Sequence, residues 1–274
     1  MRTTWGIATD RGQVREINED AVLAQPPIFL VADGMGGYEA GDVASRVVVD
    51  AFRELAGRTR LSTGEIHERF QAATRELRTV LDSSSPAGST VAGAALINQD
   101  GLDYWLIFNI GDSRVYSWQD ETLSQISVDH SVVQELIDAG VLNGDDASSH
   151  PQRHQVTRAL ATHVDPDPDY WLIPSDAARR ILICSDGLTT EVNDRDIAAT
   201  LRAHSDAQDA ADNLVADALA AGGRDNVSVV VVDLAPSDGA GLGVGATAVD
   251  GEDTNSHWDE QLEGATIPRA HGRK

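Results

Sequence analysis

The stretch IFLVADG at residues 28–34 joins an apolar run to an Asp-Gly pair, and ILICSDG at residues 181–187 has the same form. Apolar runs of this length rich in Ile, Leu and Val predict buried strands. Helix-forming sequence follows each pair, so Asp33-Gly34 and Asp186-Gly187 are expected at strand ends that converge. The other Asp-Gly pairs lack this context, because 100–101 is typical of a hairpin turn and 238–239 and 250–251 have no flanking strands.

The 274 residues suffice for one large domain, and we expect a single domain over 1–235 followed by a tail. Apolar residues form 41% of the chain and fall in short runs, as a packed core requires. Because the sequence shows neither an apolar run near about 18 residues nor a signal peptide, we expect a cytoplasmic protein. The single cysteine, Cys184, lies in an apolar run and is expected to be a buried thiol.

The formal net charge of −23 argues against binding to nucleic acid or to an anionic membrane surface, since both carry negative charge. Most of this charge is expected to serve solubility. Gathered carboxylates can also bind hard divalent cations through oxygen ligands, so the positions of the acidic residues decide between the two.

The apolar patterns predict a series of strands and helices. Strands are expected at 4–10, 28–32, 89–97, 103–110, 114–118, 122–127, 170–173, 179–185 and 226–234, with helices at 41–56, 62–81, 132–139, 196–204 and 205–223. Capping boxes at Ser62/Glu65 and Ser205/Gln208 mark two helix starts, and Gly222 and Gly223 mark a helix end. Three or four of these strands, between 89 and 127, are expected to form an antiparallel meander. This order predicts an α+β sandwich of mainly antiparallel sheets flanked by helices.

Two segments do not fit regular elements. The polar stretch 143–155 lies in an insertion of about 141–168, which is interpreted as a mobile flap. Residues 236–274 are rich in Gly, Ala and Asp without an apolar period and are interpreted as a disordered acidic tail. Trp258 in this tail could dock on a surface, although a plain linker is favoured.

Two further aspartates are expected at sheet ends, Asp225 in GGRDNV and Asp112 in NIGDSRVY. Each could be an ordinary turn residue on its own. Together with Asp33 and Asp186 they form an all-oxygen set, and no Cys or His pair has zinc spacing, so Mg²⁺ or Mn²⁺ is favoured over Zn²⁺.

Two metal ions held by carboxylates lower the pKa of a bridging water, which can then attack phosphorus without a covalent enzyme intermediate. Such a reaction also needs a phosphate anchor. Arg15 could bind phosphate oxygens through its two-pronged guanidinium group, or it could merely pair with the nearby carboxylates of Glu19 and Asp20.

The ordered motifs of the chain resemble those of the protein phosphatase 2C-like (PPM) family, bacterial branch. The similar segments, which span residues 5 to 234, are TDRGQVREINEDAV, FLVADGMGGYEAGDVAS, GSTVAGAAL, NIGDSRVY, ISVDHSVVQELIDAGVL, VTRAL, ILICSDGLTTEV and GGRDNVSVVVV. The resemblance implies a four-layer α-β-β-α sandwich. It also implies a metal-dependent phosphatase of phosphoserine and phosphothreonine in proteins, which opposes Ser/Thr kinases and is expected to be a monomer.

The same resemblance implies roles for particular residues. Asp33 would bridge two Mn²⁺ or Mg²⁺ ions, with Asp186 and Asp225 completing the pair of sites. The carbonyl of Gly34 would contribute to one ion, Glu19 would reach metal through water with Asp20 nearby, and Asp112 would help to hold a possible third ion. Arg15 matches the phosphate-binding arginine.

Met35 stands where animal members have a histidine that is proposed as the general acid. Departure of a Ser or Thr alkoxide needs a proton, and a metal-bound water is favoured as its source over His130, His150 and His154. A capping and packing role is favoured for His130, because Ser131 follows it at a predicted helix start.

Two other functions compete with a protein phosphatase. The chain could be a binding module that has lost turnover, although every expected metal position keeps its carboxylate. It could also hydrolyse a small phosphate ester or nucleotide, although the sequence has no Walker motif to support that activity.

Overall fold

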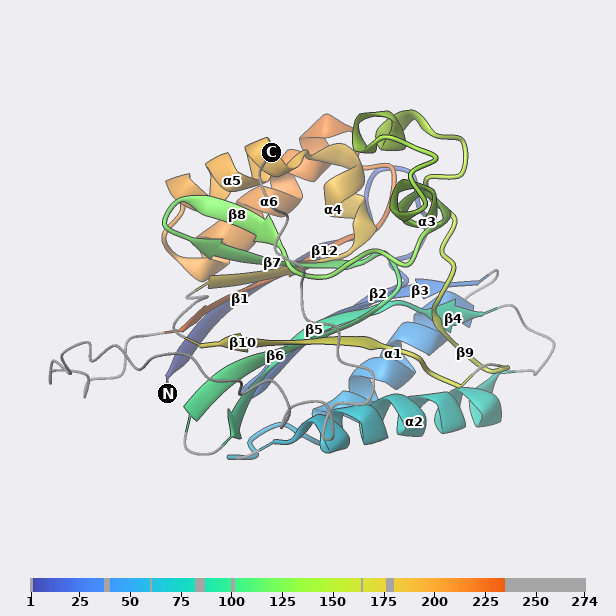
Figure 1. Cartoon of the computed structure of the whole chain (residues 1–274), viewed down its shortest axis with the longest axis vertical. Coiled ribbons are helices and arrows are strands. Elements are labelled where there is room, and N and C mark those ends of the chain that lie inside the picture. The colour runs from blue at the N-terminus through green and yellow to red at the C-terminus, as the bar shows by residue number, and fades with distance from the viewer. Residues whose placement is uncertain are drawn as a thin grey trace, which may run out of the picture.

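The computed structural model describes residues 2–36, 40–59, 61–81, 87–99, 102–163, 165–175 and 180–234. In this part of the chain two antiparallel sheets pack face to face, and helices cover the outer face of each (Figure 1). The α+β fold class and the α-β-β-α layer order expected from the sequence are therefore confirmed.

One sheet has seven strands in the order β10-β6-β5-β3-β4-β9, with β2 paired to β3. Its strands are β2 (Asp20–Gln25), β3 (Ile28–Met35), β4 (Gly88–Ser89), β5 (Val91–Gln99), β6 (Leu102–Ile110), β9 (Leu160–Ala161) and β10 (Asp169–Pro174). The other sheet has five strands in the order β1-β12-β11-β7-β8. These strands are β1 (Thr3–Asp10), β7 (Arg114–Gln119), β8 (Thr122–Gln125), β11 (Arg180–Cys184) and β12 (Val227–Leu234).

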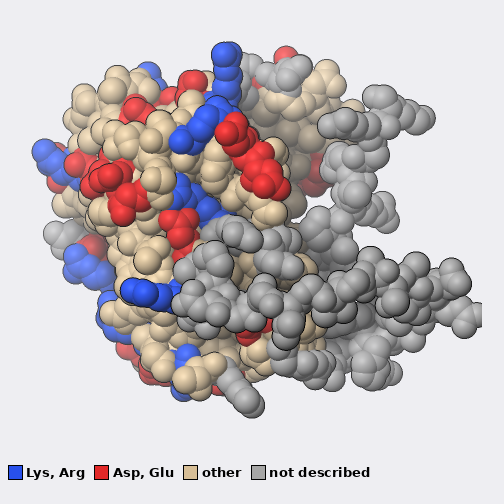
Figure 2. Space-filling view, turned by 90° about the vertical axis from the view of Figure 1, so that its left-hand side faces the viewer, with Lys and Arg blue, Asp and Glu red and all other residues tan. Residues whose placement is uncertain are grey.

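The helices divide between the two sheets. The seven-stranded sheet carries α1 (Ala40–Arg53) and α2 (Thr63–Val80), and the five-stranded sheet carries α4 (Asp186–Glu191), α5 (Asp194–Ala203) and α6 (Ala207–Ala221) (Figure 1). The short helix α3 (Val132–Asp138) and the 3₁₀ helix η1 (Gly144–Ser149) lie near α4. On the face seen in Figure 2, acidic and basic side chains lie among one another rather than in one patch.

The core consists of three apolar layers. One lies between the two sheets, and each of the others lies between a sheet and the helices that cover it. Strands β3, β11 and β12 are covered on both faces, which explains why IFLVA, RILIC and VSVVVV are apolar at nearly every position. Cys184 is fully buried, as expected. The two Asp-Gly pairs thus mark the points where deeply buried strands reach the edge of the sandwich.

Most predicted elements occur within a few residues of their expected bounds. The capping box of α2 is present, with Ser62 accepting a hydrogen bond from the backbone N–H of Glu65 and Glu65 accepting one from the backbone N–H of Ser62. Gly222 and Gly223 end α6 with φ angles of 154° and 54°.

The predicted four-strand meander is wrong. Strands β5 and β6 form a hairpin in the seven-stranded sheet, whereas β7 and β8 pair with each other in the five-stranded sheet. The chain changes sheets at Gly111, whose φ of 114° is rarely adopted by residues with a side chain. A short run of strands can form a meander or cross between sheets, and their sequence alone does not distinguish these paths.

Two local predictions also need correction. Strand β2 was not predicted, because DAVLAQ is short and Ala-rich. Helix α6 is capped by Asp206 rather than Ser205, since Asp206 Oδ1 accepts hydrogen bonds from the N–H groups of Gln208 and Asp209 at 2.8 and 3.0 Å. The Gln208 side chain instead bonds the backbone of Ile7 in β1, which ties α6 to its sheet.

The flap, residues 141–168, contains η1 and β9 and is attached to the domain at its returning end. There the N–H of Val132 donates to the carbonyl of Gln155 at 2.9 Å, and Ser131 forms a β-bridge with Val156. Its mobility stays a prediction. The predicted tail, including Trp258, lies outside the described residues. Across the described helices, none is both long and apolar enough to cross a membrane.

Candidate active site

An open cleft of about 650 Å³ lies at one end of the two sheets and brings together residues predicted from distant parts of the sequence. The predicted site residues that line it are Arg15, Glu19, Asp33, Gly34, Asp112, Asp186 and Asp225. Asp20 does not line this cleft and lies behind it, where its Oδ2 accepts a hydrogen bond from the Ser185 hydroxyl at 2.9 Å.

The carboxylates come from both sheets. Asp33 lies near the end of β3 in the seven-stranded sheet, while Asp186 begins α4 directly after β11 and Asp225 precedes β12 in the five-stranded sheet. Both carboxylates line the cleft, and the charge of Asp186 raises the pKa of Asp33. The convergence predicted from the two Asp-Gly pairs is thus present in the structure.

Position 34, after Asp33, requires glycine because another backbone segment lies too close for a side chain. A Cβ on Gly34 would overlap the backbone of Gly41 at the start of α1. The N–H of Gly34 also donates to the carbonyl of Glu19 at 3.2 Å. Thr90 fixes Asp33 itself, since its hydroxyl accepts from the Asp33 N–H at 3.1 Å and its own N–H donates to the Asp33 carbonyl at 2.9 Å.

The second Asp-Gly pair is held in a similar way. A Cβ on Gly187 would overlap the backbone of Asn226, so the start of α4 packs directly on the segment that carries Asp225. The Asn226 side chain accepts from the N–H of Glu19 at 2.9 Å and donates to the carbonyls of Arg11 and Ile17 at 2.9 Å each.

Asn226 and Thr90 also belong to the site, and neither was predicted from the sequence. Both fall inside quoted motifs, GGRDNV and GSTVAG, which was the signal available for them. Neither carries a charge, and their roles in fixing the backbone depend on segments more than about fifty positions away in sequence. Their function is therefore visible only in the folded chain.

Burial and mutual repulsion raise the pKa of the clustered carboxyl groups. Burial raises the pKa of Asp20 to about 7 and that of Asp112 to about 8, and in both cases Asp186 adds repulsion. Burial, followed by repulsion from Asp20 and Asp186, raises the pKa of Asp33 well above its ordinary value. Burial and Asp225 likewise raise the pKa of Asp186. So many carboxylates at one place would be stabilised by a cation.

The residues fit divalent ions on further grounds. The buried Oδ1 of Asp20 has no hydrogen-bond partner, and the carboxylates that line the cleft offer oxygen ligands, as Mn²⁺ and Mg²⁺ prefer. No three His, Cys, Asp or Glu side chains among the described residues already stand as a compact ligand cluster. Repulsion between carboxylates opposes such closeness without a cation.

We expect the metal-free protein to lose thermal stability as the pH rises from about 4 to about 8. Asp20 and Asp112 keep their protons in the folded state up to pKa values of about 7 and about 8, whereas in the unfolded chain they ionise near about 4. The folded state binds more protons in this interval, so the free energy of unfolding falls with rising pH. Scanning calorimetry in chelator tests this, and a melting temperature that increases across the interval would contradict it.

Arg15 is held at the cleft by a carboxylate from the other end of the chain. Its Nη2 donates to Asp225 Oδ2 at 2.7 Å, and half of its side chain is exposed. The ion-pair partner of Arg15 is thus Asp225, not Glu19 or Asp20, the two partners that the sequence suggested. The contact places the guanidinium group beside a candidate metal ligand. This hydrogen bond raises the pKa of Arg15, so the group is a permanent cation.

The three candidate histidines have different surroundings. His130 does not line the cleft, its side chain is 2% exposed and both ring nitrogens have partners, so it does not deliver a proton there. Ser131 caps α3 through the N–H of Gln134, as predicted. His150 does not line the cleft either, whereas His154 does.

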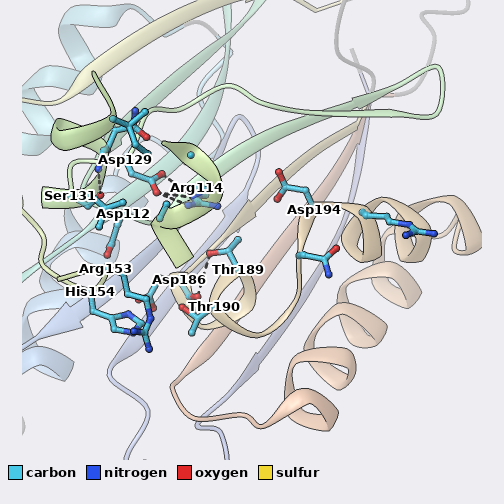
Figure 3. Close-up of a pocket in the computed structure, with 17 residues that line it drawn as sticks. Asp112, Arg114, Asp129, Ser131, Arg153, His154, Asp186, Thr189, Thr190 and Asp194 are labelled. Carbon is cyan, nitrogen blue, oxygen red and sulfur yellow. Dashed lines mark hydrogen bonds and ion pairs between the residues drawn. The ribbon is translucent and has the colours of Figure 1, made fainter. Parts of the chain in front are cut away.

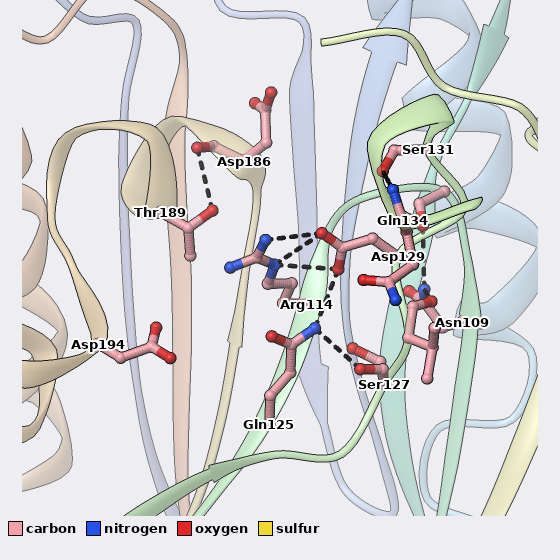
Figure 4. Close-up of polar contacts among 12 residues, drawn as sticks. Asn109, Arg114, Gln125, Ser127, Asp129, Ser131, Gln134, Asp186, Thr189 and Asp194 are labelled. Atoms are coloured by element: carbon pink, nitrogen blue, oxygen red, sulfur yellow. Dashed lines mark hydrogen bonds and ion pairs between the residues drawn. The ribbon is translucent and has the colours of Figure 1, made fainter. Parts of the chain in front are cut away.

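A second cavity of about 680 Å³ adjoins the cleft and shares Asp112, Asp186, Arg153 and His154 with it (Figure 3). Asp129 also borders this cavity, but it is bound by Arg114 at 2.7 to 3.0 Å and by Gln125 at 3.0 Å (Figure 4). These contacts satisfy the Asp129 carboxylate, so it is not available as a ligand in the way that Asp112 is.

An acidic cleft beside an arginine, at the end of a four-layer α-β-β-α sandwich, has the ligands and the phosphate anchor that metal-dependent hydrolysis of phosphate esters requires. The family model described as protein phosphatase 2C matches residues 11–221. The chain therefore belongs to the protein phosphatase 2C family, as its motifs indicated.

Curated relatives support this assignment. A serine/threonine phosphatase stp of Listeria monocytogenes is 35% identical over 242 residues, which cover 82% of this chain and 93% of the relative. The serine/threonine protein phosphatase PstP of Mycobacterium tuberculosis is 36% identical over 256 residues, which cover 91% of this chain and 48% of PstP.

Solved structures agree with the fold. The M. tuberculosis phosphatase PstP/Ppp has a TM-score of 0.78 and 34% identity, with 85% of this chain and 98% of that chain covered. The catalytic domain of PstP in complex with two manganese ions has a TM-score of 0.73 and 32% identity, with 84% and 97% covered.

Proposed function

We propose that this chain hydrolyses phosphoserine and phosphothreonine in proteins with the help of divalent metal ions. The observation that carries the proposal is the convergence of Asp33, Asp186 and Asp225 beside the guanidinium group of Arg15. Membership in the family and relatives named serine/threonine phosphatases support the same enzyme class, a hydrolase of phosphoproteins.

The carboxylates of Asp33, Asp186 and Asp225 and the carbonyl of Gly34 would hold two core ions, with Glu19 and Asp20 acting nearby. When bound, the ions supply Lewis acidity, which lowers the pKa of a coordinated water and offsets charge on the phosphate. Arg15 binds two phosphate oxygens with its planar fork and orients the phosphorus for attack. The manganese ions of the PstP structure support Mn²⁺, while Mg²⁺ and a third ion at Asp112 are further proposals.

The departing alkoxide needs a proton, which Met35 does not supply. A water in the cleft stays the first candidate for this role. His154 is the candidate side chain, since it lines the cleft on the flap. His130 is excluded by its burial and its two hydrogen-bonded nitrogens.

Phosphoproteins are the substrates that the family implies. Opposition to a Ser/Thr kinase pathway, a monomeric state and a cytoplasmic location are proposals that extend from the sequence. We also propose that the chain divides into a phosphatase domain at 1–235 and an acidic tail at 236–274.

Hydrolysis of a phosphothreonine peptide tests the proposal, measured as phosphate release with Mn²⁺, with chelator, and with Mn²⁺ restored. We expect turnover with Mn²⁺, loss of it with chelator and recovery on restoration. Lack of turnover at saturating Mn²⁺ would instead favour a binding module. Release from small esters such as p-nitrophenyl phosphate without release from any phosphoprotein would favour a small-molecule phosphohydrolase.

A further inference from the structure

We propose that His130, oriented by Asp169 and Arg158, is a positioning residue that fixes the Gly111–Asp112 turn and joins it to the returning end of the flap. Its catalytic consequence rests on the proposed function, whereas the contacts themselves can be tested without turnover.

His130 binds both backbone polar groups of Gly111. The Gly111 N–H donates to His130 Nδ1 at 3.1 Å, and the His130 N–H donates to the Gly111 carbonyl at 2.9 Å. The side chain of Asn109 adds a third hydrogen bond, from Nδ2 to the same carbonyl at 3.1 Å. Both the N–H and the carbonyl of Gly111, the residue directly before Asp112, are therefore fixed by hydrogen bonds.

Gly111 is also the point where the chain changes sheets. Its φ of 114° favours glycine, and a Cβ there would overlap the side chain of Thr90, which itself fixes Asp33. Small shifts of this turn would therefore move Asp112 relative to Asp33.

The other ring nitrogen of His130 sets the tautomer. A backbone N–H can only donate, so Nδ1 must be the acceptor and Nε2 must carry the proton. Nε2 donates to Asp169 Oδ2 at 3.1 Å, in a position where the His130 side chain is 2% exposed. Arg158 in turn binds both oxygens of Asp169 at 3.2 Å with the two arms of its guanidinium group.

The same group of residues reaches the flap. The His130 carbonyl accepts from the Thr157 N–H at 2.8 Å, and Arg158 is the next residue along the flap. Contacts thus run from Gly111 to His130, to Asp169, to Arg158 and back through Thr157 to His130. His130 therefore contacts both the turn before Asp112 and the returning end of the flap, and it links the positions of the two segments.

Hydrogen exchange tests the positioning role directly. In the metal-free full chain, His130→Leu should speed exchange at 109–113 and 155–158 by about 10-fold or more, because both side-chain hydrogen bonds of His130, to Gly111 and to Asp169, are lost. His130→Asn can still offer an acceptor to Gly111 and should protect 109–113 better than His130→Leu does. His67→Leu, which removes the hydrogen bond between His67 in α2 and the Tyr170 hydroxyl in β10, is the matched control and should leave both segments unchanged.

A double-mutant cycle tests whether His130 acts through Asp112. We expect His130→Leu to lower kcat on a phosphothreonine peptide by about 10-fold or more, as loss of a partner that orients a ligand does. Combined with Asp112→Asn, it should cause little further loss. Asp169→Asn provides a milder variant if His130→Leu folds poorly.

Unchanged exchange at both segments, or losses from His130→Leu and Asp112→Asn that multiply, would overturn the proposal. If the wild-type chain hydrolyses no phosphopeptide, the proposed function fails while the exchange experiment still decides the role of His130.

Discussion

Replacing Asp33 with Asn should lower turnover of a phosphothreonine peptide by at least about 1,000-fold, which corresponds to about 4 kcal/mol in activation free energy. Asp33 is the carboxylate proposed to bridge both core ions, so its loss removes a ligand from each. Steady-state kinetics over a range of Mn²⁺ concentrations measure the effect. Saturating Mn²⁺ should not restore the rate, because the amide oxygen of Asn is a neutral and weaker ligand.

The same substitution should act in the opposite direction on stability. Without metal, Asp33 is repelled by Asp20 and Asp186, and burial further disfavours its charge. The metal-free Asp33→Asn protein should therefore melt at a higher temperature than the metal-free wild type near neutral pH. Asp103→Asn, at a β6 position outside the cleft, is the control and should change neither property much. A variant that lost activity only by unfolding would melt lower instead.

Replacing Arg15 with Ala should lower kcat/KM by about 100-fold, since a charge-assisted fork to phosphate contributes about 2 to 3 kcal/mol. Arg15→Lys should recover only part of this loss, because an ammonium group keeps the charge but not the planar fork. Both variants should be assayed on a phosphopeptide and on p-nitrophenyl phosphate, since Arg15 is proposed to bind the phosphate group of either substrate.

Arg11→Ala provides the control for Arg15, because Arg11 lies on the same loop and is exposed but does not line the cleft. Its activity should stay close to that of the wild type. A loss smaller than about 10-fold for Arg15→Ala, or an equal loss for Arg11→Ala, would show that Arg15 only pairs with Asp225 and does not bind substrate.

The sequence predicted those features that depend on local pattern. The apolar runs that end at Asp33 and Asp186 identified two buried strands, since burial on both faces requires apolar residues at nearly every position. The capping box at Ser62 likewise depends on residues a single turn apart. Motif order added the layer arrangement and most of the cleft residues.

Features that depend on distant partners could not be predicted in this way. The crossing at Gly111 is determined by which sheet offers the next free edge, and this is a property of the assembled sandwich. Arg15 faced two acidic neighbours in sequence, yet its partner is Asp225, 210 positions away. A packing role was favoured for His130 from its place before a helix start, but its partners Gly111 and Asp169 lie 19 and 39 positions away and are visible only in the folded chain.

The pairing of β1 with β12, which matches Thr3 with Leu234, has a consequence for synthesis. Arg15 and Asp33 leave the ribosome early, but Asp225 and β12, which pairs with β1 in the five-stranded sheet, leave about two hundred residues later. Contacts of such long range form last and slow folding. A nascent chain that lacks β12 therefore carries an incomplete five-stranded sheet, and we expect it to gain phosphatase activity only after Asp225 and β12 have emerged.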